Sequence, residues 1–97
     1  MSTLLRTGVI GLGILGSQHA RLIHKRADFE LTAVADLRAD LAQSLAAETG
    51  ASPYTEYQEM LREHALDLVV IATPDPYHRK PALAALSALR AFLPLRL

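Results

Sequence analysis

The sequence predicts an α/β fold in which helices cover both faces of a parallel sheet. Short apolar runs alternate with segments of helical period along the 97 residues. A glycine cluster, G-L-G-I-L-G at residues 11–16, follows the first apolar run. The run L-V-V-I-A at residues 68–72 shows no alternation of apolar and polar residues, which is typical of a parallel strand buried on both faces.

The first half of the chain predicts two strand–helix pairs. Residues 5–10 form an apolar run that stops at glycine, and residues 31–35 form a second run that stops at an aspartate. Residues 15–27 and 37–49 have helical period. The predicted inner face of the first helix consists of Gly16, Ala20, Ile23 and Ala27, and Gly50 is expected to end the second helix in the left-handed conformation.

The second half predicts a short strand over residues 51–54, with Pro53 at an edge or a strand end. A capping box, with Thr55 as N-cap and Gln58 reaching back, opens the next helix. The last helix is expected to begin near Tyr77 or His78, because Pro81 is tolerated only in a first helical turn.

Right-handed crossovers then give about four parallel strands in the order 3-2-1-4. We expect a partial domain over residues 1–88 and an atypical tail over 89–97, with the sheet incomplete on its C-terminal side.

The glycine cluster has the G-x-G-x-x-G form between a predicted strand and a predicted helix, which indicates a Rossmann-type dinucleotide loop. Gly11 permits the tight turn, Gly13 lets a pyrophosphate approach the backbone, and Gly16 lets helix and strand pack closely. The amides of Ile14 and Leu15 lie at a helix N-terminus, which favours an anion. No lysine follows Gly16, which excludes a triphosphate P-loop. The alternative is a glycine-rich turn without a ligand.

Asp36 ends the second predicted strand, 20 residues after Gly16. A carboxylate at this spacing accepts hydrogen bonds from the adenosine ribose and repels a 2′-phosphate, so it favours NAD. Arg38 could instead pair with a 2′-phosphate, which leaves NADP open, or it could be an exposed residue of the first helical turn.

The segment V-V-I-A-T-P-D-P-Y-H at residues 69–78, with G-L-G-I-L-G-S-Q-H-A-R and A-V-A-D, resembles the glucose–fructose oxidoreductase / inositol dehydrogenase (Gfo/Idh/MocA) family. The resemblance covers the family's N-terminal NAD(P)-binding domain, at about residues 5–86. It implies that Thr73 and Pro74 lie along the nicotinamide side of the cofactor, and that His78 positions this loop or lines the cleft. Family members oxidise or reduce a hydroxyl of a sugar, a polyol or a related small molecule.

The family's next strand, its E-K-P motif and its substrate domain do not follow in this sequence. Residues 89–97, L-R-A-F-L-P-L-R-L, do not resemble that strand; they suggest a truncated or out-of-frame end, or else a short helical extension. We therefore expect no catalytic residue, no hydride transfer by this chain alone, and an open edge on the fourth strand that favours self-association.

Composition limits the other classes of function. The net charge of +0 argues against nucleic acid as a partner, and the absence of cysteine argues against a thiolate metal site. No membrane span or signal peptide is predicted, and we expect a cytoplasmic protein. Tyr54 and Tyr57 are expected to pack against the sheet, and no role is assigned to His24 or His64.

Three functions remain open at this point. The chain could be an oxidoreductase fragment that keeps the adenosine half of its site. It could be a non-enzymatic dinucleotide-binding module, or a subunit completed by a partner chain. A different oxidoreductase with the same first half, such as an amino-acid-pathway reductase, is disfavoured by the T-P-x-x-x-H stretch at residues 73–78.

Overall fold

A computed structural model describes residues 4–73 and 93–94. Strands and helices alternate along the chain in the predicted manner. The elements are β1 (Leu5–Ile10), α1 (Ile14–Lys25), β2 (Phe29–Ala35), α2 (Ala39–Thr49), β3 (Ser52–Tyr54), α3 (Tyr57–Glu63), β4 (Leu68–Ile71) and β5 (Leu93–Pro94).

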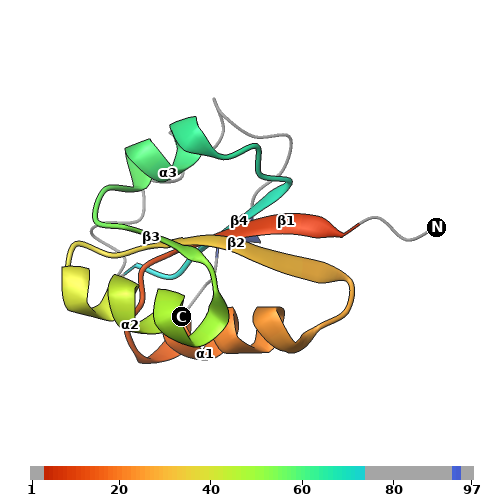
Figure 1. Cartoon of the computed structure of the whole chain (residues 1–97), viewed down its shortest axis with the longest axis horizontal. Coiled ribbons are helices and arrows are strands. Elements are labelled where there is room, and N and C mark those ends of the chain that lie inside the picture. The colour runs from red at the N-terminus through yellow and green to blue at the C-terminus, as the bar shows by residue number, and fades with distance from the viewer. Residues whose placement is uncertain (1–3, 74–92, 95–97) are drawn as a thin grey trace.

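The strands form one parallel sheet in the order β3-β2-β1-β4-β5. This confirms the predicted order 3-2-1-4 and adds a fifth strand at the β4 edge. Helices α1 and α2 lie on one face of the sheet and α3 lies on the other, as Figure 1 shows. The described part of the chain is therefore a three-layer α/β structure.

The core has one apolar layer on each side of the sheet, because side chains alternate along every strand. Val9, Val34 and Val70 belong to one layer, which also contains Ala20 of α1 and Leu45 of α2. The other layer contains strand residues of the opposite parity, with Met60 and Leu61 of α3; its strand members include Ile10, Ala33, Ala35, Val69 and Ile71. The continuous apolar run at β4 is thus explained by burial on both faces, as the sequence predicts.

The register of the strands brings three loops to one edge of the sheet. Ile10 of β1 pairs with Ala35 of β2 on one side and with Ile71 of β4 on the other. The chain therefore leaves all three strands at the same level. The loops that carry Gly11, Asp36 and Thr73 must lie side by side, as they do at the carboxyl edge of other parallel sheets.

The prediction for Gly50 is confirmed, and two other predictions about helix ends are wrong. Gly50 caps α2 in the left-handed conformation, with φ of 83°. Helix α1 ends at Lys25, so Ala27 lies beyond it and is exposed. Helix α3 begins at Tyr57 with Glu56 as N-cap and no side-chain capping bond. Thr55 lies one residue too early to cap it, so the capping box is not formed.

The tail prediction also needs correction. Residues 89–97 were not expected to supply a strand, yet Leu93 and Pro94 pair with Val70 and Ile71 of β4. The β4 edge is therefore not fully open. A proline is compatible with this position, because an edge strand can lack an N–H donor without breaking a ladder on both sides. The helix expected from Tyr77 or His78 lies outside the described residues.

Within residues 4–73 and 93–94, no helix combines the length and the apolar character that crossing a bilayer requires.

Candidate functional site

The glycine loop joins β1 to α1 and lies directly against the loop that follows β4. Gly11 has φ of 94°, a conformation that side-chain-bearing residues rarely adopt. A Cβ atom at Gly11 would lie 2.8 Å from the amide nitrogen of Thr73 and 2.9 Å from the carbonyl carbon of Ala72. Glycine is therefore required here both by the turn and by the approach of a second backbone.

Gly16 brings the first turn of α1 against the loop itself. A Cβ atom at this position would collide with the carbonyl group of Gly11, which is rigid backbone. Gly13 differs, because a Cβ atom there would meet only the Arg38 guanidinium, at 3.9 Å. Gly11 and Gly16 thus permit packing inside the protein, whereas Gly13 borders open space.

The N-terminus of α1 is the part of the loop that can receive an anion. Gly13 is the N-cap and makes no side-chain capping bond. Helix geometry leaves the amides of Ile14 and Leu15 without a carbonyl partner inside the helix. These amides and the helix dipole are suited to a phosphate group, and no side chain of the N-cap competes for them.

Asp36 connects the end of β2 to this loop. Its Oδ2 atom accepts a hydrogen bond of 2.7 Å from the amide of Leu12, in the middle of the glycine motif. Its Oδ1 atom accepts one of 2.9 Å from the amide of Arg38. The carboxylate therefore fixes the distance between the glycine loop and the start of α2.

The side chain of Arg38 completes the environment of Asp36. Its Nε atom lies 3.0 Å from Oδ1, and its Nη2 atom lies 3.1 Å from Oδ2. Burial raises the pKa of Asp36, but the hydrogen bonds from Arg38 and Leu12 outweigh it and hold that pKa below its usual value. Asp36 is thus an ionised carboxylate at neutral pH.

Two residues that stabilise the loop were missed by the sequence analysis. Leu12 was treated only as a spacer, although its amide binds Asp36. Ser17 donates from Oγ to the carbonyl oxygen of Leu12 at 2.8 Å. A serine directly after Gly16 was the available signal, since short hydroxyl side chains commonly bond nearby backbone at the start of a helix.

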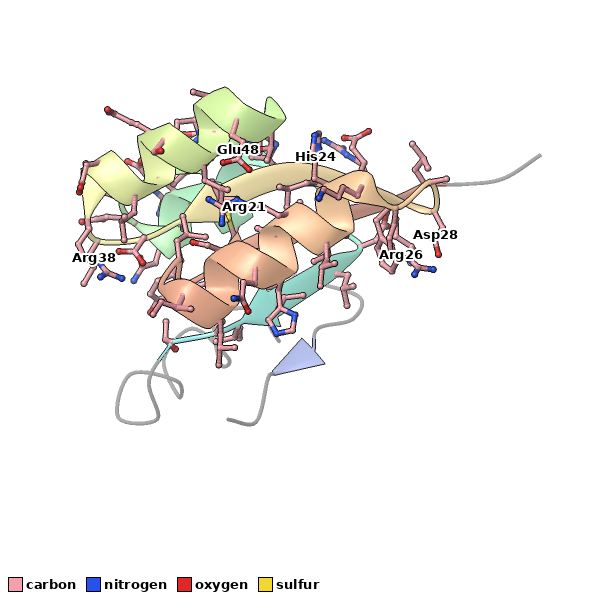
Figure 2. All side chains as sticks on the ribbon, turned by 90° about the horizontal axis from the view of Figure 1, so that it is seen from below. Arg21, His24, Arg26, Asp28, Arg38 and Glu48 are labelled. Atoms are coloured by element: carbon pink, nitrogen blue, oxygen red, sulfur yellow. The ribbon has the colours of Figure 1, made fainter. Side chains whose placement is uncertain are left out.

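An open hollow of 430 Å³ lies beside the loop. Arg38, which could have been an exposed residue of the first helical turn, is the N-cap of α2 and precedes that turn. Figure 2 shows Arg38 at one end of the molecule, and Arg21 and Glu48 facing each other across α1 and α2. The lining of the hollow includes Leu12, Gly13, Ser17, Arg21, Arg38 and Leu41.

A second open hollow, of 490 Å³, lies at the opposite edge of the sheet, where β1 and β2 begin. Leu4, Phe29 and Gly50 help to line it, and none of the predicted site residues does. Three of the predicted site residues, Gly13, Ile14 and Arg38, instead line the smaller hollow beside the glycine loop.

The structure brings together most of the predicted site. Thr73 lies next to Gly11, and Asp36 and Arg38 lie next to the loop. Pro74 and His78 lie outside the described residues. Among residues 4–73 and 93–94, no group of three or more metal-binding side chains gathers at one place.

The tyrosines and His64 belong to a different region. Tyr54 and Tyr57 pack against the core layer beneath α3, as predicted. The Tyr54 hydroxyl donates to Glu63 at 2.9 Å, and it lies 2.8 Å from Nε2 of His64. These contacts hold β3 against the end of α3, so a structural role accounts for His64.

The chain matches one family of known proteins. A sequence model described as an oxidoreductase family with an NAD-binding Rossmann fold matches residues 5–93. The inositol 2-dehydrogenase of Rubrobacter xylanophilus is 36% identical over 83 residues, which cover 84% of this chain and 24% of that protein. The chain spans about a quarter of the length of the curated relatives that it matches.

Solved structures show the same similarity. The myo-inositol 2-dehydrogenase of Lactobacillus plantarum is 32% identical with a TM-score of 0.82, and the match covers 93% of this chain and 27% of that one. The WlbA dehydrogenase of Bordetella pertussis, solved with NADH and UDP-GlcNAcA, is 28% identical with a TM-score of 0.87. That match covers 95% of this chain and 29% of the Bordetella chain.

The contrast between the glycines predicts two different outcomes for the same substitution. Gly16→Ala should lower the free energy of unfolding by about 1–3 kcal/mol, because the new methyl group would displace the Gly11 backbone. Gly13→Ala is the matched control and should change it by less than about 1 kcal/mol, since the added atom meets ordinary contacts only. Urea unfolding measures both. Equal losses in the two variants would contradict this geometry.

The pKa of Asp36 predicts how stability depends on pH. The folded-state pKa lies below the unfolded value of about 3.9, so the carboxylate stabilises the fold above that pH. This contribution is lost as the pH falls through the folded-state pKa. Asp36→Asn should lower the free energy of unfolding by about 1–3 kcal/mol at pH 7, and by progressively less below about pH 4. A difference that grows as the pH falls would be inconsistent with an ionised Asp36.

Proposed function

Because the chain belongs to the oxidoreductase family with an NAD-binding Rossmann fold, we propose that its carboxyl sheet edge binds the adenosine diphosphate half of NAD. The pyrophosphate binds at the glycine loop, near the amides of Ile14 and Leu15. The adenosine ribose binds at Asp36. The hollow of 430 Å³ between the starts of α1 and α2 accommodates the adenosine.

One observation carries this proposal: the carboxylate of Asp36 is fixed beside the glycine loop by its 2.7 Å bond with the Leu12 amide. A glycine-rich turn alone would need no acid at this place. The bond sets a hydrogen-bond acceptor next to a helix N-terminus that favours an anion. Adenosine diphosphate carries a matching group for each at adjacent positions: a ribose diol that donates to the acceptor, and a pyrophosphate that binds at the helix N-terminus.

NAD is proposed as the preferred cofactor over NADP. The ionised carboxylate of Asp36 would repel a 2′-phosphate on the adenosine ribose. Arg38 is the one described cation that contacts Asp36, and it supports some binding of NADP. The cofactor that the charges favour is thus NAD, with NADP as a weaker ligand.

The nicotinamide half of the site is proposed from the resemblance. Thr73, beside Gly11, would lie along the nicotinamide ribose, followed by Pro74 and His78. Sugars, polyols or related hydroxyl compounds are the proposed substrate class of the whole enzyme. The family's E-K-P motif does not occur in the 97 residues, so this chain by itself is proposed to lack hydride-transfer activity.

A second candidate function is a cytoplasmic binding subunit completed by another chain. The two-residue strand β5 supports it, because the sheet ends there on a short edge that further strands could extend. The added chain could also be a second copy of this one. Pairing of two copies through this edge is less favourable, since Pro94 offers no N–H to a neighbouring strand. Residues 1–88 remain the proposed binding domain, with 89–97 as its tail.

Calorimetric titration of the purified chain with NAD, NADP and ADP-ribose tests the proposed function. NAD and ADP-ribose should bind with similar affinity, because the proposed contacts of Asp36 and of the glycine loop are with the adenosine diphosphate half that both ligands share. NADP should bind more weakly. Asp36→Ala should weaken ADP-ribose binding about tenfold or more, since it removes the ribose acceptor and loosens the loop. A folded chain that binds none of the three would refute the proposal.

A further inference from the structure

The hydrogen bonds around Asp36 use its full capacity as an acceptor. A carboxylate offers about four lone-pair positions, two on each oxygen. Oδ1 accepts from the amide and from Nε of Arg38, while Oδ2 accepts from the amide of Leu12 and from Nη2 of Arg38. All four positions are therefore filled by this chain. The side chain of Asp36 is only 8% exposed, which leaves it little contact with solvent.

A ribose diol can bind Asp36 only if some of these bonds break. The two amide bonds are set by the fold: Leu12 lies inside the glycine loop, and Arg38 is the N-cap of α2. The two guanidinium bonds are different, because the Arg38 side chain is 61% exposed and extends from the surface. The bonds that give way are therefore those of the Arg38 side chain.

The number of released positions matches the ligand. When the guanidinium leaves, one lone pair becomes free on Oδ1 and one on Oδ2. The 2′-hydroxyl and the 3′-hydroxyl of a ribose are two donors, and they need two acceptors on one carboxylate. The backbone bonds of Leu12 and Arg38 stay in place and keep the carboxylate oriented.

We propose that Arg38 is an internal competitor for the ribose site, so that its guanidinium must leave Asp36 before a ribose diol can bind. This inference rests on the proposed adenosine site and assigns to Arg38 a specificity role toward the diol. Arg38 lies over Gly13, 3.9 Å from a Cβ atom built there, so the released guanidinium stays near the proposed pyrophosphate position. Displacing Arg38 therefore lowers the binding affinity of ligands with a free diol, and it does not lower the affinity of ligands without one.

The test compares ADP with 2′,3′-dideoxy-ADP, which lacks both hydroxyl groups. The measured quantity is the ratio of their dissociation constants in the wild-type chain and in Arg38→Ala. This ratio cancels the loss of one positive charge near the diphosphate, because both ligands experience it equally. The preference for ADP should rise about two- to fivefold in Arg38→Ala, the range expected for releasing one exposed ion pair.

Arg26→Ala is the matched control. Arg26 also forms an exposed bidentate ion pair, with Asp28, but it does not line the proposed adenosine hollow. Its removal should leave the preference for ADP over the dideoxy analogue as it is in wild type. Circular dichroism and urea unfolding establish that each variant is folded before titration.

The outcomes separate this inference from the proposed function. A preference that is unchanged in Arg38→Ala, or that falls, overturns the competitor role while the adenosine site stands. A fall would mean that Arg38 contacts the ribose directly. If neither ligand binds to folded wild type or to folded Arg38→Ala, the adenosine site itself is wrong and the competitor role fails with it.

Discussion

The hydrogen bond between the Leu12 amide and the Asp36 carboxylate is the interaction on which the site depends. It joins the loop after β1 to the loop after β2. The register of the sheet makes both strands end at the same level but does not by itself link the two loops. Two neighbouring side chains support the hydrogen bond. Ser17 holds the Leu12 carbonyl oxygen, and Arg38 neutralises the carboxylate. A short, charge-assisted bond of this kind is stronger than an ordinary amide–carbonyl bond, and here it is protected by burial of Asp36.

The packing of glycines gives this bond its geometry. Gly11 lies against the backbone at Thr73, and Gly16 lies against Gly11, so three backbone segments meet without side chains between them. The loop consequently packs closely between β1, the end of β4 and α1. Asp36 then connects it to the end of β2 and the start of α2. A preformed arrangement of this sort lowers the entropy that a ligand must lose on binding.

Much of this was predictable from the sequence because it depends on local patterns. The strand order follows from alternating elements, and the packing roles of Gly11 and Gly16 follow from their places in the motif. What could not be predicted depends on distances between segments far apart in the chain. The Asp36–Leu12 bond spans 24 residues, and the pairing of Leu93 with Val70 spans nearly as many. The start of α3 was wrong by one residue, because Glu56 rather than Thr55 adopts the N-cap position.

The central claim is that the glycine loop and Asp36 form one adenosine diphosphate site. Amide chemical-shift mapping of the isotopically labelled chain during titration with ADP-ribose tests it most directly. We expect the largest shifts at residues 11–16 and 36–38, and we expect the Leu12 amide to remain hydrogen-bonded when the ligand is bound. Largest shifts at the opposite hollow, around Phe29 and Gly50, would show that the ligand binds elsewhere, and a folded chain without any shift would show that it has no such site.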